Sequence, residues 1–438
     1  MRINCSHSDE KTIHKYVKLI RKIEKKVGKA IGIMLDLQGP KFRVGILANP
    51  ILLQEEETWK LSYGASPNLI KKTIPIDFKN LAKSVEVGGN IYMDDGLIRT
   101  EVIRKDHQDV WVKVLHGGKL FSRKGVNIPN YKGRLPFLNK KDRENLLWGL
   151  KLKVDFIALS FVRKPQDIRT IRNIVQKNET DYPPMLIAKI EKPEAVENMD
   201  KIIQESDGII VARGDLGIEL SMEQVPVAQK QLIERCRYYQ KPVIIATQML
   251  DSMRSYPIPT RAEVSDVANS IYAGADAVML TGETSSGKYP IPATKMIKDI
   301  VTKVEDHMYI KTFYKKPTDF GITEVSEAFL FKAMQLADDI HAKAIILLTR
   351  RGLLTKVLSK FHPKQPIFSL AHNLHAYRRM SLYWGVFPIE INVRRADKRI
   401  EHGLEILKEN KTIKKNDHLI FIYWDFQSDN LNMKIVKA

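Results

Sequence analysis

Charged and hydroxyl side chains end four successive apolar runs in the middle of the sequence. The runs LIAKIEK, IIVARGD, IIATQ and VMLTGE end in Lys189 and Glu191, Arg213 and Asp215, Thr247, and Thr281 and Glu283. Alternate residues of a strand share a face, so Lys189 and Glu191 project together. Charged residues at any one of these strand ends could form an ordinary structural ion pair. Polar residues at four strand ends together favour a functional site.

Two of these groups, Glu191 and Asp215, are suited to a divalent cation. Mg²⁺ prefers oxygen ligands and takes one or two protein carboxylates, with substrate oxygens and water completing its shell. The glycines around Asp215 in VARGDLGIEL allow close backbone approach, and a short helical turn there would aim free N–H groups at a carboxylate or phosphate. We therefore expect a Mg²⁺ (or Mn²⁺) site beside an anion site.

The elements that must position these groups alternate between strand and helix, which is typical of a parallel sheet. Strands are predicted at RIN (2–4), AIGIMLDL (30–37), VDFIALSF (154–161), MLIAKIE (185–191), DGIIVARG (207–214), PVIIATQ (242–248) and DAVMLTGE (276–283). A helix is predicted between Thr260 and Gly274, because Thr260 and Glu263 have capping-box spacing. Seven strands predict an α/β fold of the TIM (β/α)8-type barrel with its first βα unit missing.

Two segments depart from this series. Residues 41–131 hold Gly-punctuated, strand-like pieces and predict a small inserted β-barrel domain facing the barrel across a cleft. Beyond residue 318, four strand-like runs alternate with segments of helical pattern, which predicts a C-terminal open α/β domain. The runs are AIILLTR, PIFSLA, FPIEI and HLIFIYW. The predicted domains are a barrel at 1–40 and 132–318, an insert at 41–131 and a C-terminal domain at 319–438.

The composition favours anionic partners. The chain of 438 residues carries 71 Lys plus Arg against 51 Asp plus Glu, a formal charge of +20. Basic residues are spread along the chain, so a solvated surface is favoured over a nucleic-acid stripe. No apolar run reaches the roughly 18 residues of a membrane span, and the polar start predicts a cytoplasmic protein. Cys5 and Cys236 are interpreted as small buried apolar residues.

The motifs as a set resemble those of the pyruvate kinase family. The match runs in order through RINCSH, LDLQGPKFRVG, IYMDDGLI, KGVNIP, FIALSFVR, AKIEKPEAVENMD, SDGIIVARGDLGIE, KPVIIATQMLDSM and PTRAEVSDVANSIYAGADAVMLTGETSSGKYP. It covers nearly the whole chain and is looser in the C-terminal region. The resemblance implies phosphoryl transfer from phosphoenolpyruvate to ADP, giving pyruvate and ATP in the last step of glycolysis.

The resemblance also implies a role for each predicted group in the barrel. Lys189 corresponds to the lysine that faces the transferring phosphoryl group, and Glu191 and Asp215 to the carboxylates that hold the divalent metal. The backbone amides of Gly214 and Asp215 correspond to those that receive the substrate carboxylate. Thr247 corresponds to the hydroxyl near the enolate carbon that is protonated.

Four further residues are expected to contact the phosphate and the nucleotide. By the same resemblance, Arg2 contacts the substrate phosphate, and His7 and Arg43 lie on the nucleotide side. Lys124, in the inserted domain, corresponds to a lysine that reaches the nucleotide when the insert closes over the barrel. Chemistry would then await closure of the cleft.

The sequence departs from the family at its monovalent-cation site. Of the four residues with which many members bind K⁺, Asn4, Ser6 and Asp36 are present, but Leu37 replaces the Thr. Lys41 stands where K⁺-dependent members carry Glu, and a fixed ammonium could supply the missing positive charge. We expect activity that does not require K⁺.

The C-terminal domain of relatives binds a phosphorylated effector through a Ser/Thr-Gly loop. Here that loop reads LLTRRGLLTK, with Thr349 and Gly352 retained and Arg350 and Arg351 between them, and arginines suit a phosphate. The resemblance therefore implies a possible phosphorylated effector. It also implies a homotetramer.

Three other functions are compatible with the residues. A barrel with Glu and Asp on successive strand ends also suits a metal-dependent lyase that stabilises an enolate. A pyruvate-kinase-like protein with a truncated start could be inactive. The third is a basic binding protein, for example one that binds nucleic acid, and steeply salt-dependent binding without kinase activity would distinguish it.

Overall fold

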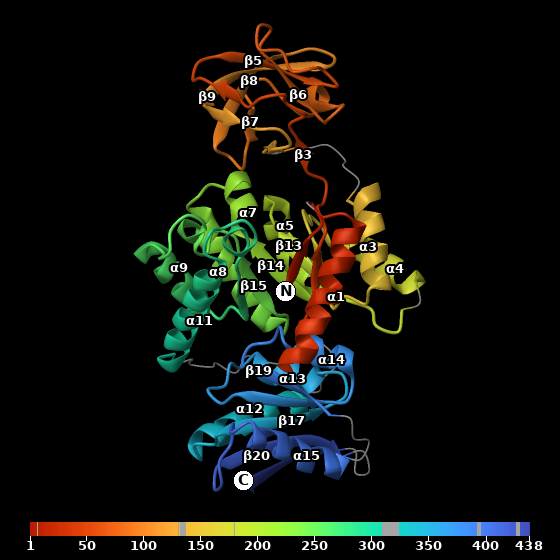
Figure 1. Ribbon diagram of the computed structural model, residues 1–438, viewed down its shortest axis with the longest axis vertical. Helices are drawn as coiled ribbons and strands as arrows, with labels where there is room; N and C mark the ends of the chain where they lie inside the picture. The colour runs from red at the N-terminus through yellow and green to blue at the C-terminus, as the bar shows by residue number, and fades with distance from the viewer. Residues whose placement is uncertain are drawn as a thin grey trace.

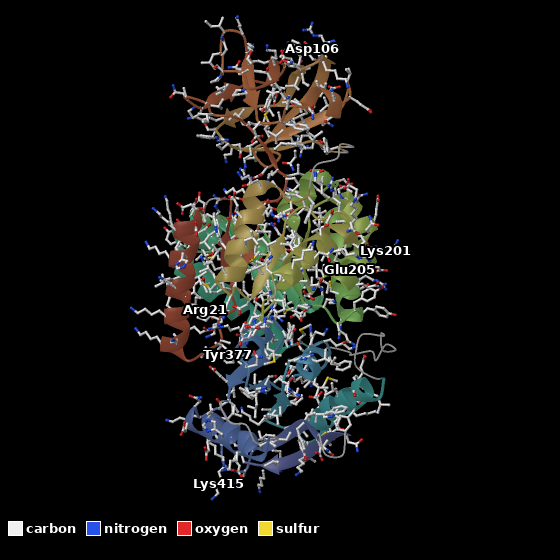
Figure 2. All side chains as sticks on the ribbon, turned by 90° about the vertical axis from the view of Figure 1, so that its right-hand side faces the viewer. Arg21, Asp106, Lys201, Glu205, Tyr377 and Lys415 are labelled. Atoms are coloured by element: carbon white, nitrogen blue, oxygen red, sulfur yellow. The ribbon has the colours of Figure 1, made fainter. Side chains whose placement is uncertain are left out.

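The computed structural model describes residues 1–6, 8–129, 131, 137–178, 180–308, 324–391, 396–425 and 430–438. Three bodies follow one another along the longest axis: a β-sheet body, a central body of parallel strands and helices, and a C-terminal α/β body (Figure 1). Figure 2 shows the same order after a quarter turn, with Arg21 and Tyr377 near the junction of the central and C-terminal bodies.

The central body is built on seven parallel strands, and each predicted run contains one of them. They are β1 (Arg2–Asn4), β2 (Met34–Asp36), β12 (Phe156–Leu159), β13 (Met185–Ile190), β14 (Gly208–Ala212), β15 (Val243–Ala246) and β16 (Ala277–Met279). They pair in the order β1-β2-β12-β13-β14-β15-β16. Among the described residues, β1 and β16 each pair on one side only. This curled parallel sheet is consistent with the predicted TIM-type barrel.

Helices cover the outer face of this sheet. The covering helices are α1 (Glu10–Val27), α3 (Lys140–Lys151), α4 (Pro165–Lys177), α5 (Pro193–Glu197), α6 (Met199–Glu205), α8 (Gln224–Tyr238), α9 (Arg261–Tyr272) and α11 (Pro290–Asp306). The predicted capping box at the start of α9 is confirmed, because Thr260 and Glu263 bond each other's backbone N–H groups. Gly274, with φ 101°, follows the end of that helix as predicted.

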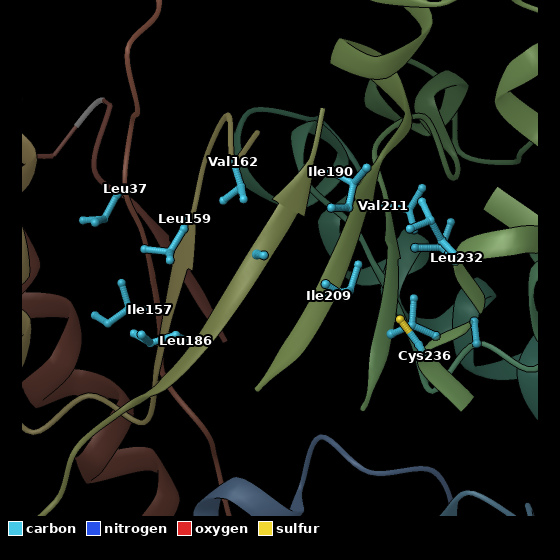
Figure 3. Packing of buried hydrophobic residues seen from close by; sticks show 14 of the residues in the cluster. Leu37, Ile157, Leu159, Val162, Leu186, Ile190, Ile209, Val211, Leu232 and Cys236 are labelled. Atoms are coloured by element: carbon cyan, nitrogen blue, oxygen red, sulfur yellow. The ribbon is translucent and has the colours of Figure 1, made fainter. Parts of the chain in front are cut away.

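The strands are apolar on both faces because both faces are buried. Ile157 and Leu159 point outward into the cluster that the helices cover (Figure 3). Phe156, from the same strand, points inward to a smaller cluster inside the barrel. Both cysteines, Cys5 and Cys236, are fully buried, as expected.

The inserted segment forms a small closed β-barrel. Its strands are β3 (Phe42–Arg43), β4 (Ile51–Leu53), β5 (Thr58–Tyr63), β6 (Thr73–Ile76), β7 (Asn90–Met93), β8 (Ile98–Lys105), β9 (Asp109–His116), β10 (Gly118–Leu120) and β11 (Gly125–Asn127), with one short helix, α2 (Leu81–Ser84). Seven of the strands pair in the order β3-β11-β7-β8-β9-β5-β6. A bridge between Val44 and Ile76 joins the two ends of that sheet, so its interior is enclosed.

The C-terminal body is an open five-stranded sheet. Its strands are β17 (Ala344–Thr349), β18 (Ile367–Ala371), β19 (Val386–Glu390), β20 (His418–Asp425) and β21 (Asn430–Lys437), and its helices α12 (Glu324–Asp339), α13 (Leu353–Ser359), α14 (Leu374–Met380) and α15 (Ala396–Glu409). The four predicted strands are present and parallel. The sequence analysis missed β21, which pairs antiparallel with β20 at the sheet edge. Its text, NLNMKIVK, is more polar because an edge strand is half exposed.

The C-terminal body also covers the amino end of the barrel. Leu382 and Tyr383, just after α14, pack against the apolar cluster inside the barrel. Arg378 of α14 binds Glu24 of α1 with a shortest distance of 2.6 Å. The barrel is therefore covered at one end by this body, and its carboxyl strand ends face the inserted β-barrel (Figure 1).

The predicted domain boundaries remain predictions. Residues 132, 318 and 319, at two of these boundaries, lie outside the described residues. His7 lies outside them too. In the described part of the chain, no helix has both the length and the apolar character needed to cross a bilayer.

Candidate active site

The predicted site residues of the barrel gather at the carboxyl ends of β13, β14 and β15. This rim faces the inserted β-barrel, residues 42–127, which we call the lid (Figure 1). Helix α7 (Arg213–Glu219) follows β14 directly and carries Gly214 and Asp215 in its first turn. Short α10 (Gly282–Ser285) follows β16. The expected helical turn after VARGD is therefore confirmed.

The ammonium of Lys189 is the centre of a buried polar cluster. Its Nζ lies 2.9 Å from Glu191 Oε1 and 3.3 Å from Asp36 Oδ1, and it donates to Ser160 Oγ across 2.8 Å. The side chain of Lys189 is only 11 % exposed, and those of Asp36 and Glu191 are 2 % and 1 % exposed. One cation therefore serves two buried carboxylates. The predicted common face of Lys189 and Glu191 is confirmed.

Burial and mutual attraction set the protonation of this cluster. Burial disfavours the charged ammonium, but the carboxylates of Asp36 and Glu191 outweigh burial and raise the pKa of Lys189. Burial raises the pKa of Glu191, and the nearby charge of Asp215 raises it further, while Lys189 opposes both. Lys189 is therefore held as a cation, whereas ionisation of Glu191 is made less favourable.

Asp215 has a different partner. Lys41 Nζ lies 2.9 Å from Asp215 Oδ1 and 3.3 Å from Asp95 Oδ1 in the lid. Burial opposes ionisation of Asp215, but Lys41 outweighs it and lowers the pKa of this carboxyl group. Burial likewise opposes the charge of Lys41, and Asp215 outweighs it and raises the pKa of Lys41. A single lysine thus bridges the barrel rim and the lid.

Thr247 is held in a strained backbone conformation beside these groups. Its φ is 70°, in the left-handed region that β-branched residues rarely adopt, and Gln248 follows with φ 54°. The Thr247 hydroxyl accepts a hydrogen bond from Gly214 N across 2.7 Å and donates to Ala246 O across 2.6 Å. Arg213 supports the turn by donating to Thr247 O. Strain that is held in place this way is typical of functional positions.

A cavity of about 500 Å³ separates the lid from the barrel on one side of this cluster. Lys41, Asn127, Phe161, Lys192 and Glu219 are among the residues that line it. A volume of this size lies in the usual range for a small-molecule ligand, roughly 300–1,000 Å³. The expected cleft between insert and barrel is therefore present.

Comparisons with known proteins place this geometry in a family. The family model described as pyruvate kinase, barrel domain, matches residues 1–294, and that described as pyruvate kinase, alpha/beta domain, matches residues 327–435. The chain belongs to the pyruvate kinase family. Membership confirms the resemblance, the fold and the predicted enzyme class, and the comparisons favour none of the alternative functions.

Curated pyruvate kinases are similar over most of the chain. The pyruvate kinase of Geobacillus stearothermophilus is 37 % identical over 423 residues, which are 96 % of this chain and 72 % of the relative. That of Clostridium acetobutylicum is 37 % identical over 390 residues, 89 % of this chain and 82 % of the relative. A crystal structure of a pyruvate kinase from Cryptosporidium parvum superposes with a TM-score of 0.89 at 35 % identity, covering 100 % of this chain and 90 % of that one.

Three of the four residues predicted to contact the phosphate or the nucleotide lie within the described part of the chain. Arg2 Nε lies 2.6 Å from Asp36 Oδ2, so Arg2 joins the Lys189 cluster. Lys124 lies on the lid, 2.7 Å from Asp94 Oδ1. Arg43 donates to Arg123 O in the lid.

The residues predicted as a K⁺ site remnant have partners within the structure. Asn4 Oδ1 accepts from Ser6 N across 3.0 Å, and Asp36 is engaged by Arg2 and Lys189. Leu37 is buried in the core, 3 % exposed. The ammonium of Lys41 instead contacts Asp215, Asp95 and the ring of Phe161.

The sequence analysis missed Ser160, which the structure places against Lys189. Ser160 follows β12 directly and donates its own proton to Leu37 O across 2.7 Å, so its oxygen is oriented toward the lysine. Its position after a strand was the available signal. Arg213 and Glu283 instead have supporting roles: Arg213 binds Asp266 at 2.6 Å, and Glu283 accepts from the backbone N–H groups of Leu250 and Thr281.

The chemistry of the rim fits a divalent cation. Glu191 and Asp215 come from neighbouring strand ends, and the charge of Asp215 opposes ionisation of Glu191, an effect that a bound cation would relieve. Within the described ranges, no group of three or more His, Cys, Asp or Glu side chains is placed to hold a metal. A site of two carboxylates, completed by substrate oxygens and water, suits Mg²⁺ or Mn²⁺.

Proposed function

We propose that this chain transfers the phosphoryl group of phosphoenolpyruvate to ADP, giving pyruvate and ATP. The observation that carries the proposal is the buried ammonium of Lys189, held 2.9 Å from Glu191 on the strand next to the one that leads into Asp215. Phosphoryl transfer depends on positioning and on positive charge at the phosphoryl oxygens rather than on covalent help. A fixed, desolvated cation beside a carboxylate metal site supplies that charge.

Lys189 and Arg2 bind the phosphoryl group in this proposal. Both cations share Asp36, which orients them toward one side of the rim. Ser160 fixes the ammonium from a third direction, so Lys189 needs little reorganisation as charge develops. The raised pKa of Lys189 keeps it cationic throughout the neutral range.

Gly214, Asp215 and Thr247 bind and protonate the carbon skeleton. The Gly214 amide now bonds to the Thr247 hydroxyl, and a substrate carboxylate is a stronger acceptor for that N–H. When the substrate carboxylate accepts the hydrogen bond of the Gly214 amide, the Thr247 hydroxyl loses one of its two hydrogen-bonding partners. Thr247 Oγ1 can then hold or deliver a proton at the methylene carbon of the enolate.

Glu191 and Asp215 would hold the divalent cation, Mg²⁺ or Mn²⁺. When bound, the ion neutralises oxygen charge on both substrates. K⁺ is not required in this proposal, because Lys41 already places an ammonium 2.9 Å from Asp215. Lys124, Arg43 and His7 are proposed to bind the nucleotide.

Regulation, assembly and location are further parts of the proposal. Thr349 and Gly352 shape the loop after β17, where Thr349 Oγ1 accepts from Gly352 N across 2.9 Å. Together with Arg350 and Arg351 this loop is proposed to receive a phosphorylated effector. We also propose a cytoplasmic homotetramer that acts on phosphoenolpyruvate and ADP without nucleic-acid or membrane partners.

Product analysis tests the proposed function. Purified full chain is incubated with phosphoenolpyruvate, ADP and MgCl₂, and ATP and pyruvate are measured separately. Equimolar formation of both products is expected. Cleavage of a longer acid without ATP would establish the lyase instead, and absence of both products from folded protein, with steeply salt-dependent binding to DNA or RNA, would establish a binding protein.

A further inference from the structure

Helix α7 presents two acidic side chains on one face, a turn apart. Asp215 and Glu219 have the i, i+4 spacing that places residues side by side on a helix. Asp215 belongs to the proposed metal site. Glu219 has no assigned role, yet its side chain is only 1 % exposed.

The buried carboxylate of Glu219 is bonded from two directions. Lys192 Nζ lies 2.5 Å from Glu219 Oε1. Asn127 of lid strand β11 donates its side-chain amide to the same oxygen across 3.1 Å. Asn127 is itself 4 % exposed. A buried carboxylate is costly without such partners, so the position of α7 depends on both of them.

Each partner of Glu219 belongs to another part of the site. Lys192 directly follows Glu191 in the sequence. Burial raises the pKa of Asp215, but Lys41 lowers it more strongly, and the charge of Lys192 contributes a smaller lowering. Asn127 lies in the last strand of the lid before the chain returns to the barrel. Glu219 thus joins α7, the strand end that carries Glu191, and the lid.

The lid touches α7 at a second point, one helical turn away. Lys41 bridges Asp215 and lid residue Asp95. Gly96 follows Asp95 in the lid and lies very close to α7. A Cβ atom added to Gly96 would be 3.3 Å from Ile218 Cγ1, so this lid turn packs directly on the helix. The lid therefore contacts Glu219 directly and reaches Asp215 through Lys41.

We infer that Glu219 is a positioning residue that transmits closure of the lid to α7. In the closed lid, Asn127 fixes Glu219 and the Lys41 bridge fixes Asp215, so the helix holds Asp215 and the Gly214 amide at their working places. In an open lid, Glu219 loses the Asn127 amide and α7 loses one of its two anchors. This inference deepens the proposed function and rests on it.

Steady-state kinetics of three variants test the inference. In Glu219→Gln the charge that attracts Lys192 is lost, and in Asn127→Ala only the lid contact is lost. We expect kcat/KM for ADP to fall roughly 10- to 100-fold in each, with kcat and KM both changed, as for a misplaced catalytic group. Glu144→Gln is the matched control, because Glu144 lies at an exposed position of the barrel helix α3 and is not among the residues that line the cavity. It should keep wild-type kinetics.

The double variant and hydrogen exchange separate positioning from stability. Asn127→Ala combined with Glu219→Gln should cost no more than the larger single change, because both act on one link. Deuterium uptake at 125–127 and 213–219 should rise in Asn127→Ala while its Tm stays near wild type. Additive losses, or wild-type kinetics like those expected of Glu144→Gln, would overturn the inference. If Glu219→Gln does not fold, Asn127→Ala alone decides. An inactive wild-type chain would count against the proposed function instead.

Discussion

The backbone amide of Gly214 and the side-chain hydroxyl of Thr247 lie 2.7 Å apart and satisfy each other. Gly214 begins helix α7 after β14, whereas Thr247 follows β15, so the bond joins two strand ends. Two groups that we propose bind the substrate are therefore held together before any substrate arrives.

Removal of the Thr247 hydroxyl should slow the proton-transfer step. We expect Thr247→Val to lower kcat by about 10²–10⁴-fold, the usual contribution of a positioned acid or base. Thr247→Ser, which keeps the hydroxyl, should stay within about tenfold of wild type on the same reasoning. The measurement is kcat for pyruvate release with ATP formation followed in parallel. Equal rates for Val and Ser variants would remove Thr247 from the mechanism.

Loss of the Lys189 ammonium should abolish turnover and also destabilise the fold. In Lys189→Met, Asp36 and Glu191 lose their shared cation, and breaking a buried pair costs about 3–5 kcal/mol. The kcat should fall at least about 10²–10³-fold. Denaturant unfolding and product assays measure the two effects.

A second variant separates the two roles of Lys189. Lys189→Met combined with Glu191→Gln removes the unpaired charge, so part of the lost free energy of unfolding should return while turnover stays absent. Recovery of activity together with stability would show that Lys189 has only a structural role.

The Lys41 ammonium should make the enzyme independent of K⁺. Rates in KCl and in tetramethylammonium chloride are expected to agree. Lys41→Glu removes the cation beside Asp215 and should make turnover depend on K⁺ by at least about tenfold, equivalent to about 1.4 kcal/mol of lost charge stabilisation. Rates are measured at constant ionic strength, and Lys83→Glu, at an exposed position of the lid helix α2, controls for net charge. A strong K⁺ requirement of the wild type would contradict this prediction.

The interface between barrel and C-terminal body should weaken as pH rises. Burial raises the pKa of Asp276 from 3.8 to about 7, although Val243 N and Trp384 N donate to it. The imidazole of His362 is stacked on Trp384, with its Nε2 3.9 Å from Asp276 Oδ1. Other ionisable groups near Asp276 are Arg237, Cys236 and Tyr383. The folded state binds the Asp276 proton more tightly than the unfolded chain does. The stability contribution of Asp276 is therefore full below about pH 4 and is lost by about pH 7.

Asp276→Asn isolates this titration from others at the interface. Burial lowers the pKa of His362 well below 6.5, and burial also lowers that of His375 to about 4, so both histidines act in the opposite direction between pH 4 and 6.5. The free energy of unfolding of wild type minus that of Asp276→Asn should fall by on the order of 2–4 kcal/mol from pH 4 to pH 7 and stay constant above pH 8. A pH-independent difference would refute the shifted titration.

Local sequence patterns were sufficient to predict the alternation of strands and helices, the inserted β-barrel, and the projection of Lys189 and Glu191 from one face of a strand. Each depends on short-range rules: buried parallel strands are continuously apolar, and residues two apart in a strand share a face. The polar strand β21 was not predicted, because an edge strand buries too few side chains to show an apolar pattern.

Only the tertiary structure decided which partners the charged groups have. Ser160 and Asp36 come from strand ends more than 120 residues apart, and both reach Lys189 because β2, β12 and β13 are neighbours in the sheet. The position of the lid on α7 determines two further sets of contacts. Lys41 contacts Asp215, and Glu219 contacts Asn127 and Lys192. Spacing along a chain fixes which residues share a face of one element, but contacts between elements depend on packing over long sequence separations, which no local pattern encodes.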